Sequence, residues 1–292
     1  MDYTLEHHQV PTNSLHLHVV QCGPADGPLV ILLHGFPDFW YGWRKQILVL
    51  AAAGYRVWVP DQRGYNLSDK PIGIRQYTLP TLAADIIGLI DAAGRPQAML
   101  VGHDWGGIVA WHLATYHASR ISRAAILNVP HPSVLPVGFV RLPSQLVRSW
   151  YMFFFQLPWV PEQVISSHDW HLGVDSLHAT SHPGTFTEAD TTLYKAAWAQ
   201  PRALTSMINW YRALRYGLGQ EQEGGPRRVH IPIQIIWGKQ DVTLDARLAA
   251  LSQRLCDQAE LHYFPEATHW VQHEETGAVN ALLLKFLASS TE

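Results

Sequence analysis

Short apolar runs alternate with helical patterns along this chain, and this alternation limits the fold more than any other feature. Leu29–Gly35, Tyr55–Asp61 and Ala98–Asp104 are mostly apolar, as expected of strands that are buried on both faces. Other strands are expected at Leu15–Gly23, Arg123–Val129, Ile233–Gly238 and Glu260–Ala267. Helical patterns occupy Tyr41–Ala53, Leu79–Ala93, Gly106–His117, Leu244–Cys256 and Thr276–Ala288. Buried strands that alternate with helices predict an α/β fold with a mostly parallel central sheet and helices on both of its faces.

The predicted strand at Leu15–Gly23 differs from the others because apolar and polar residues alternate at its start. Alternation of this kind is typical of a strand with one exposed face. We therefore expect the side chains of His16 and His18 to point toward solvent.

The alternation stops at residue 130 and resumes at residue 229. The intervening stretch is rich in Trp, Tyr and Pro and carries helix signals, including a capping-box pattern at Thr187 and Asp190. A second helix is expected to open at Gln200-Pro201 and to carry Tyr211 on its apolar face. The polar, glycine-rich Gly219–Arg228 resembles a linker. Residues 130–228 are thus predicted to be a helical cap inserted between the two parts of the core, residues 1–129 and 229–292.

Composition narrows the class of protein. Of 292 residues, 47% are hydrophobic and 15% are charged, which predicts a compact domain with a large core rather than a disordered chain. A net charge of −3 favours neither nucleic acid nor an anionic membrane as a partner. Cys22 and Cys256 are too few for a disulfide framework and are expected to be buried or idle thiols.

The chain carries no recognisable targeting or spanning segment. Its first residues lack the pattern of a secretory signal, and the apolar stretch Trp150–Val160 is shorter than the about 20 residues that a bilayer span needs. We therefore expect a soluble, cytoplasmic protein, either a monomer or a homodimer.

Gly102–Gly107, with the sequence GHDWGG, joins a predicted strand to a predicted helix. Many hydrolases expose a nucleophile on such a glycine-flanked turn. The central residue here is Asp104, which would lie beside the free N–H groups and the positive dipole end of the helix. Asp104 could instead only cap the helix, because aspartate is a favourable N-cap. As a nucleophile, its carboxylate would attack an electrophilic carbon and form an ester on the enzyme.

Hydrolysis of such an ester needs an oxyanion hole and a general base. The loop HGFP follows a predicted buried strand, so the backbone N–H of Phe36 is one candidate oxyanion donor, and that of Trp105 is the other. Asp241 and His269 each follow a later strand, and the order nucleophile, acid, histidine is that of the α/β-hydrolases. His269 would activate water, and Asp241 would orient its imidazole.

His269 and His273 also have a four-residue helical spacing that could suit a metal ion. No third ligand is evident in the sequence, so a metal site is not expected, and the chemistry outlined for Asp104 and His269 needs no organic cofactor.

The motifs HGFPDFWYGWR, DQRGYNLSDKP, GHDWGG, NWYRAL and ATHWVQHE occur in this order over essentially the whole chain. Together they resemble the epoxide hydrolase branch of the α/β-hydrolase superfamily. The resemblance implies that two cap tyrosines hydrogen-bond the epoxide oxygen; Tyr211 in NWYR matches one of them, and Tyr151 best matches the other. It further implies that Asp104 forms a hydroxyalkyl ester, which water then hydrolyses to a vicinal diol. The apolar residues near Tyr151 point to an aryl or alkyl epoxide as the small-molecule substrate.

Three other functions are compatible with parts of the same residue set. Haloalkane dehalogenases resemble this chain and share the Asp-His-acid machinery, but they usually have asparagine where this chain has Phe36. An ester hydrolase would need serine or cysteine in place of Asp104. A non-catalytic binding protein on the same scaffold would not need Asp104, Asp241 and His269 together.

Overall fold

The computed structural model describes residues 3–216 and 227–289. Within them, an eight-stranded sheet has the order β1-β2-β4-β3-β5-β6-β7-β8. Strands β1 (Glu6–Thr12) and β2 (Leu15–Cys22) join antiparallel, β2 also pairs antiparallel with β4, and all other neighbours are parallel. The other strands are β3 (Leu29–Leu33), β4 (Arg56–Pro60), β5 (Ala98–His103), β6 (Ile121–Leu127), β7 (Ile233–Gly238) and β8 (Ala259–Phe264). This arrangement confirms the predicted, mostly parallel sheet.

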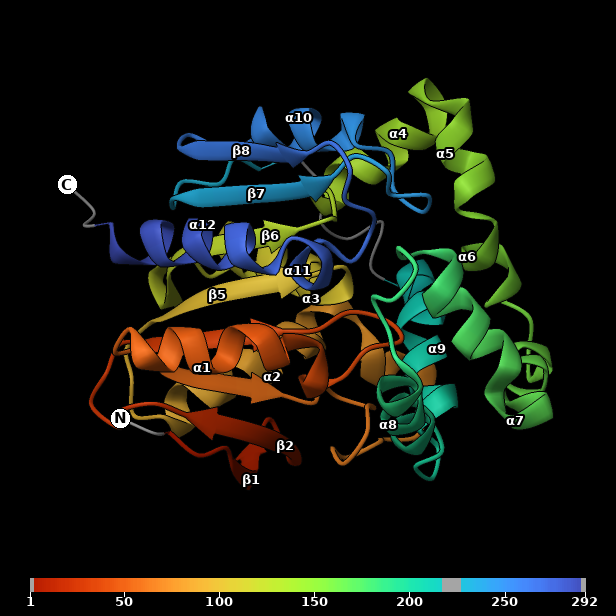
Figure 1. The fold of residues 1–292 in the computed structure, drawn as a ribbon, viewed down its shortest axis with the longest axis horizontal. Helices are drawn as coiled ribbons and strands as arrows, with labels where there is room; N and C mark the ends of the chain where they lie inside the picture. Colours follow the sequence, from red (N-terminus) through yellow and green to blue (C-terminus); the bar gives the residue numbers. More distant parts are fainter. Residues whose placement is uncertain (1–2, 217–226, 290–292) are drawn as a thin grey trace.

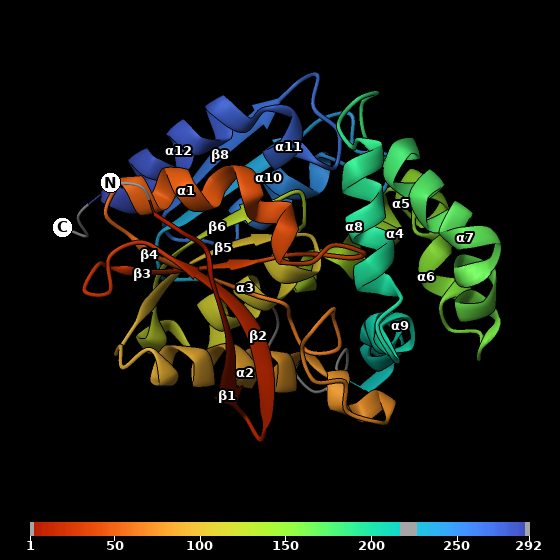
Figure 2. The same ribbon diagram turned by 60° about the horizontal axis from the view of Figure 1, so that its bottom comes forward.

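Helices cover both faces of the sheet, as Figures 1 and 2 show. Helices α1 (Arg44–Ala52), α11 (Val271–Glu274) and α12 (Thr276–Ala288) lie on one face, and α2 (Leu79–Ala92) and α3 (Trp105–Tyr116) lie on the other. Helix α10 (Arg247–Gln253) packs on β7 and β8. The 3-10 helices are η1 (Trp40–Trp43), η2 (Ile74–Tyr77), η3 (Ala118–Arg120), η4 (Pro132–Val134) and η5 (Leu214–Tyr216).

Burial on both faces explains why a central strand such as β3 is apolar throughout. Alternate residues of a strand point to opposite faces of the sheet. In β3, Leu29, Ile31 and Leu33 join the core under α2 and α3, whereas Val30 and Leu32 join the core under α1 and α12. Each residue of such a strand therefore needs an apolar side chain.

Six helices follow β6 and precede β7 within the described residues. They are α4 (Leu135–Arg141), α5 (Pro143–Arg148), α6 (Trp150–Phe154), α7 (Val160–Ala179), α8 (Glu188–Trp198) and α9 (Ala203–Ala213). In Figure 1 they lie beyond the carboxyl ends of the parallel strands. Helix α8 begins with the predicted capping box of Thr187 and Asp190. The domain boundaries stay a prediction, and most of the predicted linker Gly219–Arg228 lies outside the described residues.

Three details differ from the sequence-based expectations. Strand β1 was not predicted, because its sequence EHHQVPT is polar, contains Pro11 and pairs with β2 alone at the sheet edge. His16 is exposed as expected, but His18 is buried, with its Nδ1 2.7 Å from Asp61 Oδ2, because β2 is covered on both faces. The helix expected from Gln200-Pro201 begins only at Ala203, since Arg202 adopts a left-handed conformation.

Other expectations concern thiols and membranes. Cys22 and Cys256 are both buried and free, as predicted. Among the described residues, no helix combines the length and the apolar character needed to cross a membrane.

Candidate active site

Asp104 occupies a sharp turn between β5 and α3, with φ 49° and ψ −123°. The turn requires glycines around it, because strand and helix approach very closely. A Cβ atom on Gly102 would lie 2.5 Å from the carbonyl oxygen of Gly106, and one on Gly106 would lie 2.1 Å from that of Leu33. The glycines of GHDWGG therefore allow Asp104 to be held at the carboxyl edge of the sheet.

The Asp104 carboxyl group does not cap α3 through its side chain. Its Oδ1 instead accepts a hydrogen bond of 2.9 Å from the backbone N–H of Phe36. Burial raises the pKa of Asp104, while nearby His269 and the backbone N–H groups of Phe36 and Trp105 act in the opposite direction. The structure thus brings Asp104 together with both N–H groups predicted as oxyanion donors.

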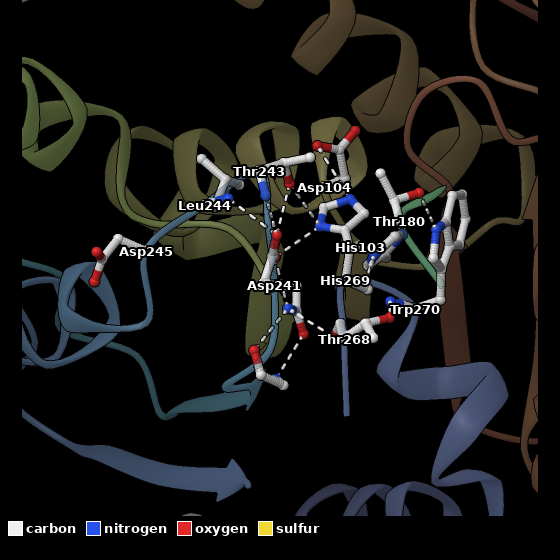
Figure 3. Close-up of polar contacts among 12 residues, drawn as sticks. His103, Asp104, Thr180, Asp241, Thr243, Leu244, Asp245, Thr268, His269 and Trp270 are labelled. Atoms are coloured by element: carbon white, nitrogen blue, oxygen red, sulfur yellow. Dashed lines mark hydrogen bonds and ion pairs between the residues drawn. The ribbon is translucent and has the colours of Figure 1, made fainter. Parts of the chain in front are cut away.

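His269 lies between Asp104 and Asp241, as Figure 3 shows. Its Nε2 is 3.8 Å from Asp104 Oδ2, which is too long for a hydrogen bond, and its Nδ1 is 2.8 Å from Asp241 Oδ2. Burial lowers the pKa of His269, but the charge and hydrogen bond of Asp241, together with the charge of Asp104, raise it above its usual value. The pKa of Asp241 shifts in the opposite direction. Burial raises it, but the charge of His269 and the hydrogen bonds from His269, Asn128 and Thr243 outweigh burial, so the net pKa is lowered. The charges of Asp241 and Asp104 thus favour the protonated form of His269, whereas its burial opposes that form.

Asp241 is held by donors that the sequence analysis did not identify. Its Oδ1 accepts from the N–H and the hydroxyl of Thr243 and from the N–H of Leu244, at 2.7–2.9 Å. Its Oδ2 accepts from Asn128 Nδ2 at 2.8 Å, and the Asn128 amide oxygen accepts from the N–H of Gly238. Asn128 follows the buried strand β6, and a polar residue at that point of a parallel sheet is the signal that could have identified it.

Tyr151 on α6 and Tyr211 on α9 face each other, with ring centroids 5.9 Å apart. Both side chains line the same cavities as Asp104. Burial and the charge of Asp104 raise the pKa of both phenols, so both remain protonated near neutral pH. Two phenols and one carboxyl group therefore line the same mainly apolar cavities.

Two cavities meet at Asp104, Tyr151 and Tyr211. The larger has a volume of about 600 Å³ and extends past Phe36 and Trp270. The smaller has a volume of about 110 Å³ and is lined mainly by apolar side chains of the core and of α9. Most of the lining side chains are apolar, and Asp104 and His269 are among the few polar ones, which is typical of a small-molecule site.

His273 does not extend the site toward a metal centre. Its Nδ1 lies 3.4 Å from Arg44 Nη1, and its ring contacts Phe186. Within residues 3–216 and 227–289, no group of three or more His, Cys, Asp or Glu side chains is placed to hold a metal ion.

Residues 28–276 match the family model for the alpha/beta hydrolase fold. Epoxide hydrolase 4 of Homo sapiens is 34% identical over 289 residues, covering 97% of this chain and 78% of the relative. The chain belongs to the epoxide hydrolase branch of the α/β-hydrolase family. This α/β-hydrolase is also 46% identical over 278 residues to AB hydrolase superfamily protein YfhM of Bacillus subtilis, covering 95% of this chain and 96% of the relative.

The fold agrees with a solved structure of the same branch. The crystal structure of Bacillus megaterium epoxide hydrolase in complex with an inhibitor matches this α/β-hydrolase with a TM-score of 0.87 and 29% identity. The match covers 97% of this chain and 100% of the other. The predicted α/β-hydrolase fold is thereby confirmed.

Proposed function

We propose that this α/β-hydrolase converts an epoxide into a vicinal diol through a covalent ester on Asp104. The observation that carries the proposal is the carboxylate itself, which lines an apolar cavity together with two protonated phenols and an imidazole. A serine in that position would support acyl transfer, whereas a carboxylate suits displacement at an electrophilic carbon.

Ring opening is the first half of the proposed reaction. One Asp104 oxygen bonds to a ring carbon while the bond from that carbon to the epoxide oxygen breaks. The oxygen keeps the electron pair and takes a proton from Tyr151 or Tyr211. Because an alkoxide is a poor leaving group, donation by a phenol lowers this barrier.

Ester hydrolysis is the second half. His269 removes a proton from a water molecule, whose oxygen attacks the Cγ atom of Asp104. The backbone N–H groups of Phe36 and Trp105 stabilise the oxyanion that forms on the former carboxylate oxygen. The intermediate then expels the diol oxygen, which takes the proton held by the His269 imidazolium. The second water proton, now on the Asp104 carboxyl group, passes to the tyrosinate and restores the carboxylate.

The two halves are linked through the pKa of His269. In the resting protein, the charges of Asp241 and Asp104 both raise this pKa against the effect of burial. Ester formation removes the charge of Asp104, so the pKa of His269 falls when a neutral base is needed. This electrostatic change makes His269 a base for the second half-reaction rather than the first.

We infer an apolar aryl or alkyl epoxide as substrate, with water as the second reactant. The larger cavity is lined by aromatic and aliphatic side chains, including Phe154, Phe155 and Trp198. Burial of such substituents is favourable by about 25 cal/mol per Å² of apolar surface. The cytoplasmic location and the monomeric or dimeric state stay predictions.

A single turnover in ¹⁸O-labelled water tests the proposal, with enzyme in excess over an aryl epoxide. We expect the label in the peptide that contains Asp104, because the attacking water oxygen remains in its carboxylate. A diol that carries all of the label would contradict the covalent route. Diol from an epoxide without halide release from a matched chloroalkane would exclude a dehalogenase, and binding without either product would leave a binding protein.

A further inference from the structure

The loop after β3 carries the proposed oxyanion donor Phe36, and helix α8 holds this loop at the next two residues. The indole N–H of Trp198 donates to the Pro37 carbonyl oxygen at 2.6 Å. The hydroxyl of Tyr194 donates to Asp38 Oδ1 at 2.8 Å. Both donors come from α8, one helical turn apart, so two parallel contacts join the loop to this helix.

Asp38 also makes hydrogen bonds within the turn that contains Phe36. Its backbone N–H donates to the Gly35 carbonyl oxygen at 3.1 Å, and its Oδ1 accepts from the N–H of Phe39 at 2.8 Å. Its side chain fills the space that Gly42 leaves open, where a Cβ atom would lie 1.8 Å from Asp38 Oδ2. The turn that presents Phe36 therefore depends on where this carboxyl group sits.

Burying Asp38 has a cost. Only 1% of the residue is exposed, and its Oδ2 has no hydrogen-bond partner among the described residues. Burial raises the pKa of Asp38 to about 7, although the hydrogen bonds from Tyr194 and Phe39 and the charge of Arg44 lower it; Asp61 raises it further. A buried carboxyl group with one oxygen lacking a hydrogen bond lowers the stability of the folded protein. We therefore expect Asp38 to serve a local function at this position.

We infer that Asp38 is a positioning residue which, together with Tyr194 and Trp198, fixes the Phe36 N–H for ester hydrolysis. The inference rests on the proposed function, because only an ester on Asp104 develops the oxyanion. Ring opening has no such oxyanion, and loss of a donor leaves the attacking carboxylate less stabilised. Disturbing Asp38 should therefore slow the second half-reaction and spare the first.

The test measures the two half-reactions separately, by rapid quenching and intact-protein mass. In Asp38→Ala we expect ester hydrolysis to slow by about 10- to 100-fold, since removing an oxyanion donor outright costs about 100- to 1,000-fold. The rate of ester formation should stay near that of the parent, so the ester accumulates. Asp38→Asn keeps an oxygen that can accept from Tyr194 and should restore most of the hydrolysis rate.

Two tyrosine variants distinguish positioning of the Phe36 N–H from a general weakening of the contact between this loop and α8. Tyr194→Phe removes the bond to Asp38, and we expect hydrolysis to slow about tenfold, which corresponds to about 1.4 kcal/mol and lies within the usual range for one hydrogen bond. Tyr41→Phe removes a comparable phenol–carboxylate bond of 3.0 Å, between Tyr41 and Asp190, that also joins this loop to α8. It should leave both half-reactions unchanged.

Each outcome decides the inference. Equal slowing of both half-reactions in Asp38→Ala and Tyr194→Phe, or no slowing in either, would overturn it. Should Asp38→Ala fail to fold, Tyr194→Phe and Asp38→Asn still provide the comparison. His269→Gln is the control for the covalent mechanism. If this variant accumulates ester while the Asp38 and Tyr194 variants hydrolyse it at the parent rate, only the positioning role is wrong. If it accumulates none, the covalent mechanism itself is wrong.

Discussion

Asp104 and Asp241 are both buried aspartates at the carboxyl edge of the same sheet, yet their surroundings move their pKa values in opposite directions. Asp241 receives donors from His269, Asn128, Thr243 and Leu244, and these outweigh the effect of burial. Asp104 receives backbone N–H groups from one side and an imidazole at 3.8 Å, and burial prevails.

The comparison shows how one residue type can serve two roles. A carboxylate whose oxygens are both saturated with donors is stable as an anion and a poor nucleophile. One with fewer donors keeps a reactive oxygen directed at the cavity. The different number of donors comes from the loops around each aspartate. Substitutions at the aspartates and in these loops should therefore change the rates of ester formation and ester hydrolysis by different amounts.

Removing the nucleophile should have the largest effect. Asp104→Ala leaves no oxygen to form the ester, and we expect turnover to fall by a factor of at least about 10⁴. Steady-state diol formation measures this. Asp257→Asn, at an exposed site just before the start of β8, is the control and should keep parent activity. Appreciable turnover by Asp104→Ala would mean that water attacks the epoxide directly.

The next largest effect should come from Asp241→Asn, which preserves shape but removes the charge beside His269. We expect ester hydrolysis to slow by about 10²- to 10⁴-fold, because the imidazole loses its orientation and the stabilisation of its cation. The pKa of His269 should also fall, since Asp241 raises it, and the acid limb of ester hydrolysis should move to lower pH. An unchanged limb would show that another group raises the pKa of His269.

Tyr211→Phe should affect the half-reaction that Asp241→Asn spares. We expect ester formation to slow by about 10- to 100-fold, with Tyr151 as the remaining donor, because general acid assistance is partly lost. Pre-steady-state ester formation is the measurement. Tyr65→Phe removes a buried hydroxyl that has no hydrogen-bond partner among the described residues and should leave this rate intact.

The raised pKa of Asp104 should be visible in the pH dependence of ester formation. Because only the carboxylate attacks, ester formation should fall about tenfold per pH unit below this pKa. The decline should begin above the pH at which an ordinary aspartate protonates, since burial raises the pKa. A pH profile of the single-turnover rate checks this, and a limb at or below pH 3.8 would contradict the inferred desolvation.

Thr243→Ala should have the smallest effect. It removes one hydroxyl donor from Asp241 Oδ1 but leaves the N–H donors of Thr243 and Leu244. We expect ester hydrolysis to slow by less than about tenfold, in keeping with about 1 kcal/mol for one hydrogen bond. Thr243→Ser should retain the parent rate. If Thr243→Ala slowed hydrolysis as much as Asp241→Asn does, the hydrogen bonds to Asp241 would not contribute independently.

Several parts of the fold could be predicted because their signals are local. Strands β3 to β7 have mostly apolar runs, and the predicted bounds of β3 to β8 differ from the observed ones by a few residues at most. Strand β1 escaped prediction because an edge strand with polar residues has no such signal. His18 was expected in solvent because strand alternation reports which residues share a face but not what covers that face.

For the site, Asp104, Phe36, Trp105, Asp241 and His269 were identifiable from short motifs that follow strands. The structure brings all five together, and it brings Tyr151 and Tyr211 to the same cavity walls. Asn128 follows a buried strand, as site residues do, but its partner Asp241 lies 113 residues away, so the sequence does not show that the two side chains meet.

The sequence by itself determined the alternating α/β order, the glycine-flanked turn at Asp104 and the chain order of the candidate site residues. These follow from side-chain periodicity and from backbone sterics within a few residues. Only the tertiary structure decided which donors saturate Asp241, why Asp104 keeps a raised pKa, and how Tyr194 reaches Asp38 across 156 residues. Burial and hydrogen bonding depend on groups that are distant in the chain and meet only when the core closes.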